Sequence, residues 1–206
     1  MARERRKGEH LYYPVTLDVA GKTCLVVGGG AVAARKAQAL AICGAKVLVV
    51  APEVGKGVEA LVRAGKARHR AKRFSAADVR GAFLAVAATD DTETNRAVFS
   101  AARRNGALVN VVDMPEFCDF LVPAVLRRGP IAIAVSTGGA SPYLAAAVRD
   151  VIGKTIGPQY GRAAVEMGRL RPVVKRTVAG LAARKRIFSQ AASEIMARAA
   201  GGKGKR

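Results

Sequence analysis

The segment 23–36, TCLVVGGGAVAARK, constrains the fold of this chain more than any other stretch. It begins with mostly apolar residues typical of a buried strand, continues with three glycines and ends with small residues typical of a helix. Gly28, Gly30 and Ala33 fit the G-x-G-x-x-G/A pattern, and Glu53 lies twenty residues beyond Ala33. The segment therefore predicts a dinucleotide site. The alternative is a structural glycine turn in an α/β domain that binds nothing.

Each residue type in this pattern has a mechanical role. Gly28 allows the tight turn, Gly30 lets the backbone approach a pyrophosphate, and Ala33 keeps the helix close to the sheet. The N-terminus of the helix then offers free N–H groups and a partial positive charge to the phosphates. Glu53 would repel a 2′-phosphate, which favours NAD over NADP, although Lys56 nearby argues the other way.

Strand and helix signals alternate through the first half of the chain. We expect strands at 23–27, 46–51, 67–73, 81–88 and 107–112, and helices at 31–43, 54–64 and 92–104. Apolar strands that alternate with helices indicate a parallel sheet covered on both faces, with the strand near 67–73 at an edge. Ligands on such a sheet collect at the carboxyl ends of the strands. Those ends hold the glycine turn, Pro52, Glu53, Thr89 and Asp113.

The pattern changes after Asp113. Short apolar strands at 120–126 and 131–136 predict a hairpin, and a second glycine-rich loop at 136–142 opens a helix at 142–153. The remainder to Ala200 is helical by periodicity, with Pro172 starting or kinking a helix. The fold class is therefore α/β, a Rossmann-like parallel sheet domain followed by a small α+β segment and a helical C-terminal domain. The expected divisions are a disordered leader 1–11, an NAD-binding domain 12–113, the segment 114–150 and a basic helical domain 151–206.

The formal net charge of +20 requires a partner or another explanation. Residues 151–206 alone carry 13 Lys and Arg against 2 acidic residues. Nucleic acid is the usual partner of such a basic protein, yet the chain contains no RNP, KH or helix-turn-helix signature. A polyanionic small substrate or solubility would also explain the charge.

Cysteine usage and hydropathy bear on the compartment. Cys24, Cys43 and Cys118 are odd in number and show no C-x-x-C spacing, so we expect reduced thiols in a cytoplasm. The charged first residues lack an apolar signal core, and no apolar run approaches membrane-spanning length. The sequence therefore favours a cytoplasmic protein without a membrane partner.

Few side chains are suited to catalysis. The two histidines, His10 in the leader and His69 on an edge strand, are poorly placed for a Ser-His-Asp hydrolase. The glycine turn lacks the Lys-Ser/Thr of a P-loop, and metal-ligand spacing is absent, so we expect no resident metal. Asp113 follows a buried strand, at the sheet edge where the nicotinamide end of a cofactor would lie. Its alternative role is to cap a turn, since Pro115 follows two residues later.

Taken together, these motifs resemble the precorrin-2 dehydrogenase and sirohydrochlorin ferrochelatase family, the N-terminal module of siroheme synthases in its stand-alone form. The resemblance covers about residues 12–150. It is carried by 13–17 (YPVTL), 26–36 (VVGGGAVAARK), 49–52 (VVAP), 87–91 (AATDD), 109–113 (VNVVD), 120–124 (FLVPA) and 136–142 (STGGASP).

The resemblance implies NAD-dependent oxidation of precorrin-2 to sirohydrochlorin, with ferrous iron insertion added in some members. It puts the cofactor on the residues Gly28, Gly30, Ala31, Val32, Pro52, Glu53 and Thr89. The family's essential aspartate matches Asp113, which would accept or relay a proton. Candidate substrate contacts are Asn110, Ser136, Thr137 and Gly138, and a buried polar cap is an equal alternative for Asn110. Thr137 stands where some relatives carry a phosphorylated serine, with Ser136 adjacent.

The same resemblance implies a polyanionic tetrapyrrole substrate and a homodimer. A basic cleft would attract and hold the substrate's carboxylates, which gives part of the positive charge a purpose without nucleic acid. Relatives dimerise through the segment that corresponds to 114–150. A monomer that exposed Ile131, Ile133, Val135 and Leu144 would carry an unusual apolar patch.

Two other classes of protein remain open. The segments 28–33 and 88–95 also resemble the nucleotide-sensing regulatory domains of potassium transport systems, which perform no chemistry. That interpretation gives Asp113 and the 136–142 loop no role. The other class is an RNA-binding protein that depends on the basic C-terminal segment.

Overall fold

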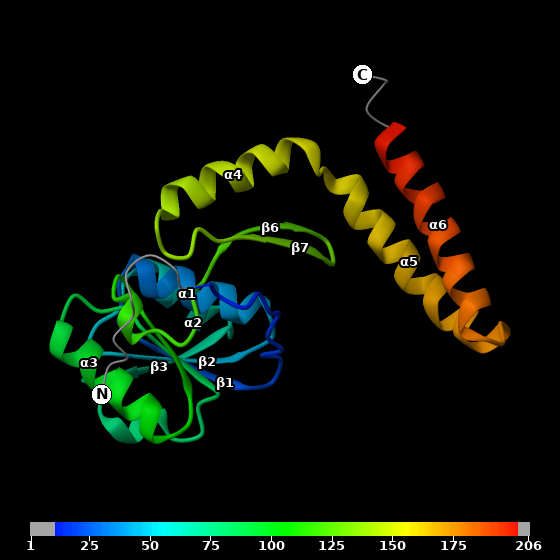
Figure 1. Ribbon diagram of the computed structural model, residues 1–206. Helices are drawn as coiled ribbons and strands as arrows, with labels where there is room; N and C mark the ends of the chain where they lie inside the picture. Colours follow the sequence, from blue (N-terminus) through cyan, green and yellow to red (C-terminus); the bar gives the residue numbers. More distant parts are fainter. Residues whose placement is uncertain (1–10, 202–206) are drawn as a thin grey trace. The chain divides into compact units, whose positions relative to one another are not determined.

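The computed structural model describes residues 11–201 and divides into two compact units, Met1–Leu121 and Val122–Arg206 (Figure 1). Residues 1–10 of the expected leader and the terminal residues 202–206 lie outside the described residues.

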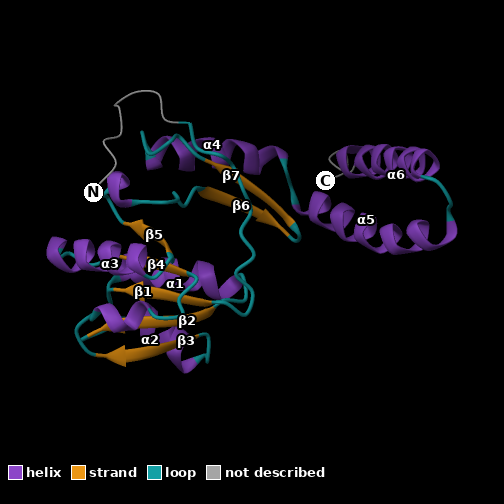
Figure 2. Ribbon diagram, turned by 60° about the horizontal axis from the view of Figure 1, so that its bottom comes forward, coloured by secondary structure: helices purple, strands orange, loops and turns teal. Residues whose placement is uncertain are grey.

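The first unit is built on a five-stranded parallel sheet with the order β3-β2-β1-β4-β5 (Figure 2). Its strands are β1 (Thr23–Val27), β2 (Lys46–Ala51), β3 (Ala67–Ala71), β4 (Leu84–Ala87) and β5 (Leu108–Val111). Its helices are α1 (Ala31–Ile42), α2 (Lys56–Arg63) and α3 (Thr92–Arg104). The chain adds β2 and β3 on one side of β1 and returns to add β4 and β5 on the other. The point where this order reverses lies between β1 and β4.

Two hydrophobic clusters cover the two faces of this sheet. On one face, Ala33 and Ala37 of α1 and Val58 and Leu61 of α2 pack against alternate strand residues such as Val26. On the other face, the packing residues are Val98, Ala101 and Ala102 of α3, Val79, and strand residues such as Leu25. Strands buried on both sides are expected to be apolar throughout, as β1 and β4 are. The predicted parallel sheet with helices on both faces is confirmed.

Several boundaries differ from the expected ones. The strand expected at 81–88 is shorter, because Gly81 has a φ of 73° and Ala82 N–H donates to the Val79 carbonyl in a turn. Two short 3-10 helices, η1 (Ala76–Val79) and η2 (Pro115–Phe117), were not predicted. The capping box of Ser75 and Asp78 begins η1 and Pro115 begins η2, and such local features leave little trace in hydrophobic periodicity.

Asp78 in η1 is the most buried carboxylate among the described residues, with its side chain 3% exposed. Its Oδ2 accepts from Ser75 N and Ser75 Oγ and lies 2.8 Å from Lys72 Nζ, while Oδ1 lies 3.3 Å from Arg70 Nη1. Burial acts to raise the pKa of Asp78, but the hydrogen bonds from Lys72 and Ser75 and the charge of Lys72 outweigh it. The pKa of Asp78 is therefore lowered from its ordinary value of 3.8.

Replacing Asp78 with Asn should destabilise the first unit by about 2 kcal/mol at pH 7, because charged partners lose their acceptor. A carboxyl whose pKa is lowered by folding contributes stability above its unfolded pKa and loses it as the pH falls through the folded value. The difference between wild type and variant should thus shrink below about pH 4. Thermal unfolding followed by circular dichroism at pH 7 and pH 3.5 measures it, with Asp90→Asn as the exposed control. An equal difference at both pH values would contradict this account.

The second unit contains a hairpin and three helices. β6 (Ala124–Arg128) and β7 (Ile131–Val135) pair antiparallel, so the predicted hairpin is confirmed, although its first strand begins later than expected. The helices are α4 (Pro142–Thr155), α5 (Pro158–Thr177) and α6 (Leu181–Gly201). A helix does not start at Pro172, because Pro172 lies inside α5, which continues to Thr177. Gly180, with a φ of 84°, lies in the break that separates α5 from α6.

Candidate functional site

The glycine turn after β1 is held by backbone contacts to its two neighbouring strands. Gly28 N–H donates to the Val50 carbonyl at 3.0 Å, and Gly28 has a φ of 124°, which side chains rarely adopt. A Cβ atom at Gly28 would lie 2.1 Å from the Ala88 carbonyl oxygen. The tight-turn role predicted for Gly28 is therefore supported, and the turn lies where the order of the sheet reverses. Crevices at such switch points are where doubly wound sheets bind ligands.

Gly29 is a residue that the motif analysis missed, because the pattern leaves that position open. A Cβ atom at Gly29 would lie 2.0 Å from the Glu53 carbonyl oxygen, and the Gly29 carbonyl accepts from Gly55 N–H at 2.9 Å. Backbone contacts thus join the glycine turn to the segment that follows β2. The run of three glycines was the available signal, since a close backbone approach excludes any side chain.

The N-terminus of α1 has the features that a phosphate group requires. Gly30 is the N-cap and supplies no side-chain hydrogen bond, and the first turn contains no acidic residue. A Cβ atom at Gly30 would meet nothing within 4 Å, so open space lies before the helix. Ala31 and Val32 begin the first turn, whose N–H groups have no partner within the helix, and Ala33 is fully buried against the sheet. These residues fit a dinucleotide pyrophosphate.

The segment after β4 is held rigid by a side chain that the sequence did not single out. Asn95 is 6% exposed; its Oδ1 lies 2.8 Å from Thr89 Oγ1, and its Nδ2 donates to the Thr89 carbonyl at 2.9 Å. Thr89, expected to contact the cofactor, therefore has its hydroxyl engaged within the loop. Asp91 caps α3 by accepting from Glu93 N–H, and the hydrogen bond from Thr94 is the main reason that the pKa of Asp91 is lowered.

Pro52 and Glu53 follow β2 at the same edge of the sheet, and both are exposed. His69 on β3 is half-buried, with its Nε2 2.9 Å from the Ala51 carbonyl oxygen. This hydrogen-bond contact with the backbone supports a structural role for His69.

Asp113 lies two residues beyond the end of β5, where a turn leads into η2. With a φ of 60°, Asp113 is the one non-glycine residue of the described chain in the left-handed region, and it is exposed. Aspartate is among the few non-glycine residues that tolerate this region, and a residue held there can mark a turn or a functional site. No hydrogen bond to the Asp113 carboxylate occurs within residues 11–201, so the turn-capping alternative gains no support.

Asn110 in β5 carries a buried polar atom without a partner. Its Nδ2 donates to the Phe120 carbonyl at 3.0 Å and lies 3.4 Å from Cys118 Sγ, whereas its Oδ1 has no hydrogen-bond partner. The residue is 5% exposed and points to the face of the sheet that carries α1, because strand side chains alternate. A buried acceptor without a donor is costly, so a ligand donor would be favoured there. Through Nδ2 the amide of Asn110 acts as a buried polar cap, while its Oδ1 remains an unsatisfied buried acceptor.

Cys24 and Cys118 are buried, and Cys43 is half-buried. Burial raises the pKa of Cys24 to about 11, against the opposing charge of Lys22, so the Cys24 thiol is unreactive at neutral pH. The Sγ of Cys118 accepts from Val111 N–H at 3.2 Å and lies within hydrogen-bond reach of the Val111 and Met114 carbonyls. Cys118 thereby ties the end of β5 to the turn that contains Asp113.

Ser136, Thr137 and Gly138 lie in the second unit, in the loop between β7 and α4. Thr137 Oγ1 accepts from Ser141 N–H and lies 3.0 Å from the Ser141 carbonyl, so its hydroxyl closes the loop that caps α4. Ser136 Oγ accepts from Gly138 N–H at 3.2 Å. A phosphate on Thr137 would break the contacts of its hydroxyl with Ser141. A phosphate on Ser136 would affect the contact of its hydroxyl with Gly138 N–H.

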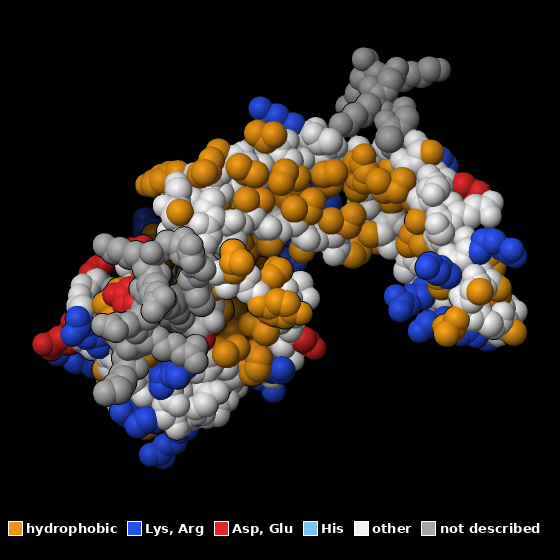
Figure 3. Space-filling model, viewed as in Figure 1, with side chains coloured by type: hydrophobic (Ala, Val, Ile, Leu, Met, Phe, Trp, Pro, Cys, Tyr) orange, Lys and Arg blue, Asp and Glu red, His pale blue; other side chains and the backbone are white. Residues whose placement is uncertain are grey.

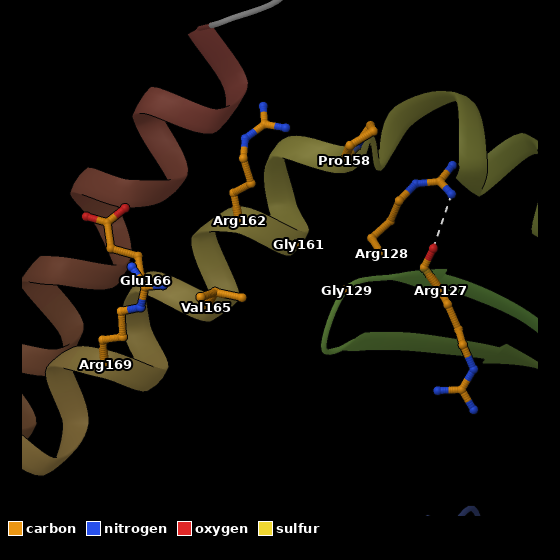
Figure 4. A pocket seen from close by; sticks show the side chains of 9 residues that line it. All are labelled: Arg127, Arg128, Gly129, Pro158, Gly161, Arg162, Val165, Glu166 and Arg169. Atoms are coloured by element: carbon orange, nitrogen blue, oxygen red, sulfur yellow. Dashed lines mark hydrogen bonds between the residues drawn. The ribbon is translucent and has the colours of Figure 1, made fainter. Parts of the chain in front are cut away.

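A surface groove of about 780 Å³ lies in the second unit, between the tip of the hairpin and α5 (Figure 4). It is lined by Arg127, Arg128, Gly129, Pro158, Gly161, Arg162, Val165, Glu166 and Arg169. Arg128 donates to the carbonyls of Gly153 and Ile156 at the end of α4, and Glu166 pairs with Arg198 on α6. None of the sequence-predicted site residues lines this groove.

No group of three or more His, Cys, Asp or Glu side chains in the described part of the chain could hold a metal ion. Within residues 11–201, no helix has both the length and the apolar character needed to cross a membrane.

A doubly wound parallel sheet with an uncapped glycine turn at its switch point defines an NAD(P)-binding protein of the Rossmann class. Comparison with known families agrees, because residues 15–124 match the family described as "Putative NAD(P)-binding". Residues 128–155 match the family "Sirohaem biosynthesis protein central". The chain belongs to the family of siroheme synthase N-terminal modules, as the sequence motifs indicated.

Relatives and solved structures support the same assignment. The chain is 41% identical to the siroheme synthase of Nitrosococcus oceani over 177 residues, which cover 86% of this chain and 38% of that protein. It is 43% identical to the siroheme synthase of Methylobacillus flagellatus over 163 residues, 79% of this chain and 35% of that protein. It thus spans well under half the length of these relatives. The structure of "SirC, precorrin-2 dehydrogenase" superimposes with a TM-score of 0.75 and 25% identity, over 91% of this chain and 98% of that one.

Proposed function

We propose that the protein oxidises precorrin-2 to sirohydrochlorin with NAD⁺ as the hydride acceptor. The observation that carries the proposal is that the glycine turn and Asp113 lie at the same edge of one sheet, after β1 and β5. The likeness to a precorrin-2 dehydrogenase over nearly the whole chain supports the same activity.

The cofactor would lie across the switch point of the sheet. Gly28 and Gly30 form the turn, and Ala31 and Val32 offer backbone N–H groups to the pyrophosphate. The exposed Glu53 accepts hydrogen bonds from a ribose and disfavours a 2′-phosphate, which supports NAD over NADP. Pro52 and Thr89 border the same crevice from β2 and β4. When bound, NAD⁺ supplies the two-electron oxidation.

The proton that leaves the macrocycle would go to Asp113. An exposed carboxylate that accepts no hydrogen bond from residues 11–201 could accept a proton from a substrate carbon or relay it to water. Asn110, in the strand that precedes Asp113, is a candidate substrate contact, because a pyrrole N–H could satisfy its unpartnered Oδ1 once substrate uncovers this buried atom. Ser136, Thr137 and Gly138 are further candidate contacts for the substrate, whose carboxylates suit a chain of net charge +20.

Ferrous iron would be a second substrate if the protein also inserts iron into sirohydrochlorin. The odd number of cysteines, without C-x-x-C spacing, favours a cytoplasmic location.

An anaerobic assay with precorrin-2 and NAD⁺ tests the proposal. The expected result is one NADH for each sirohydrochlorin formed, and siroheme above the no-enzyme rate after ferrous iron is added would establish chelatase activity as well. NAD⁺ binding without NADH would favour a nucleotide-sensing domain. Salt-sensitive RNA binding without affinity for NAD⁺ would favour the RNA-binding alternative.

We further infer that the protein is a homodimer that buries the exposed face of α4. Tyr143, Leu144, Val148 and Val151 are all exposed, and the last three recur at helical spacing on α4. Figure 3 shows hydrophobic side chains gathered along this helix. A contiguous apolar face of this kind indicates a protein interface.

Replacing Leu144 and Val148 with Asp should convert the dimer to a monomer, because two unpaired charges would enter an apolar contact. We expect dimer affinity to fall at least about 100-fold, since burying an unpaired charge costs several kcal/mol. Light scattering after size exclusion should change from twice the chain mass of 21.5 kDa to that mass. The control is Ile42→Asp, an exposed apolar residue of α1, which should leave the dimer intact. Wild-type protein that is monomeric at micromolar concentration would refute the inference.

A further inference from the structure

Asn95 is a buried residue whose side-chain hydrogen bonds, within residues 11–201, all go to Thr89. It lies near the start of α3 and is 6% exposed. Its Oδ1 accepts from Thr89 N–H at 3.4 Å and lies 2.8 Å from Thr89 Oγ1, while its Nδ2 donates to the Thr89 carbonyl at 2.9 Å. The donor and the acceptor of the buried amide are thus both satisfied. Through this one side chain, α3 holds both backbone groups and the hydroxyl of a residue in the loop after β4.

The loop that Asn95 holds lies directly against the glycine turn. A Cβ atom at Gly28 would lie 2.1 Å from the Ala88 carbonyl oxygen and 3.3 Å from Thr89 N, so the peptide that joins Ala88 and Thr89 packs on the turn. Ala88 N–H donates to the Val27 carbonyl at 2.8 Å, which ties the start of the loop to the end of β1. The Ala88–Thr89 peptide therefore lies at the switch point, where a doubly wound sheet binds its ligand.

The Thr89 hydroxyl is engaged by partners within the protein. Besides Asn95 Oδ1, it lies 3.0 Å from the Asp91 carbonyl oxygen, and its Oγ1 accepts from Asp91 N–H at 3.2 Å. A hydroxyl carries a single hydrogen, so a ligand could receive it only if these contacts were broken. The geometry thus favours a role for this hydroxyl in holding the loop over direct hydrogen bonding to a cofactor.

We propose that Asn95 is a positioning residue for the cofactor and that it acts through Thr89. Its amide fixes the Ala88–Thr89 peptide beside the glycine turn, so that the loop has the same shape before and after a dinucleotide binds. Preorganisation of this kind increases affinity, because the loop then loses little freedom on binding. The inference rests on the proposed function, and it names α3 as the element that sets the shape of the cofactor site on the β4 side.

Calorimetric titration of Asn95→Leu with NAD⁺ tests this role without turnover. A leucine has a similar branched shape but cannot hydrogen bond to Thr89, so we expect NAD⁺ affinity to fall about tenfold, or about 1.4 kcal/mol. In the assay with precorrin-2, the KM for NAD⁺ should rise by a similar factor, while kcat and the KM for precorrin-2 change little. The control is Val98→Ala, which destabilises α3 from a fully buried position and leaves the Thr89 contacts in place. It should bind NAD⁺ as wild type does.

A double-mutant cycle separates positioning from direct contact by the hydroxyl. Thr89→Val should weaken NAD⁺ binding less than Asn95→Leu does, because Asn95 Nδ2 can still hold the Thr89 carbonyl. Thr89→Val added to Asn95→Leu should cause no further loss, since the hydroxyl acts through Asn95. Thr89→Ser, which keeps the hydroxyl, should resemble wild type.

Other outcomes overturn the inference. Additive losses in the cycle would show that the Thr89 hydroxyl binds the cofactor directly. Wild-type affinity in Asn95→Leu, or an equal loss in Val98→Ala, would leave Asn95 as a structural residue of α3. If Asn95→Leu does not fold, Asn95→Asp replaces it, because it keeps the acceptor and puts an oxygen that repels the Thr89 carbonyl in place of Nδ2. Wild-type affinity in that variant would refute the role as well.

Failure of the proposed oxidation gives a different result. Wild-type protein that binds NAD⁺ but forms no NADH would contradict the dehydrogenase function, while the calorimetric comparison of the variants would still decide the role of Asn95. Wild-type protein without affinity for NAD⁺ would contradict both.

Discussion

Asp113→Asn should lower kcat/KM for NADH formation about 100-fold or more, the range over which a general base contributes. Asn keeps the shape of the side chain and is among the few residues that tolerate a φ near 60°, so the turn should remain folded. The variant therefore removes the proton acceptor with little disturbance of the backbone.

The matched control is Glu116→Gln, which neutralises an exposed carboxylate three residues further along. It should retain wild-type turnover, and both variants should bind NAD⁺ as wild type does. If Asp113→Asn kept wild-type kcat/KM, another group would have to accept the proton. The aspartate would then be a turn residue with no part in the chemistry.

Gly28→Ala should be the most destabilising single substitution in the glycine turn. Its Cβ atom would overlap the Ala88 carbonyl at 2.1 Å, and both partners are backbone, so neither can move away cheaply. Strain at a φ of 124° adds to the clash. We expect a loss of about 3 kcal/mol, which is about 10 °C in thermal midpoint for a chain of this size.

Two other glycines separate the causes of that loss. Gly65→Ala shares the positive φ, at 66°, but meets nothing within 4 Å, so only about 1 kcal/mol of strain is expected. Gly30→Ala should keep the thermal midpoint and weaken NAD⁺ binding measured by calorimetry, because its Cβ atom projects into open space before α1. Equal midpoints for all three variants would disprove the assigned backbone contacts.

Local sequence patterns were sufficient to predict the sheet, the hairpin and the place of Asp113. β1 and β4 bury side chains on both faces because helices cover both. A nearly continuous run of apolar residues is therefore the local sequence signal for these strands. The glycine turn could also be predicted, because its residues are adjacent in sequence and the lack of a side chain at each glycine has a steric purpose. Asp113 could be predicted because parallel strands deliver their carboxyl ends to one edge.

The contacts that the sequence did not reveal join residues distant along the chain. Position 29 has to be glycine because the backbone carbonyl of Glu53 approaches it closely. The amide of Asn95 is unremarkable in a helical segment until the fold brings it against Thr89. The helix start that Pro172 allowed does not occur, since this proline lies inside α5.

The contact between Gly29 and Glu53 separates two properties of position 53. The Glu53 carbonyl is fixed against the glycine turn, whereas its side chain is exposed and takes no part in that contact. In the binding mode proposed above, side-chain changes at position 53 would alter the preference for NAD or NADP while the turn stays intact. A side chain at position 29 would instead displace the glycine turn and the end of β2 together. The proposed determinant of cofactor choice is thus separable from the backbone contact beside it.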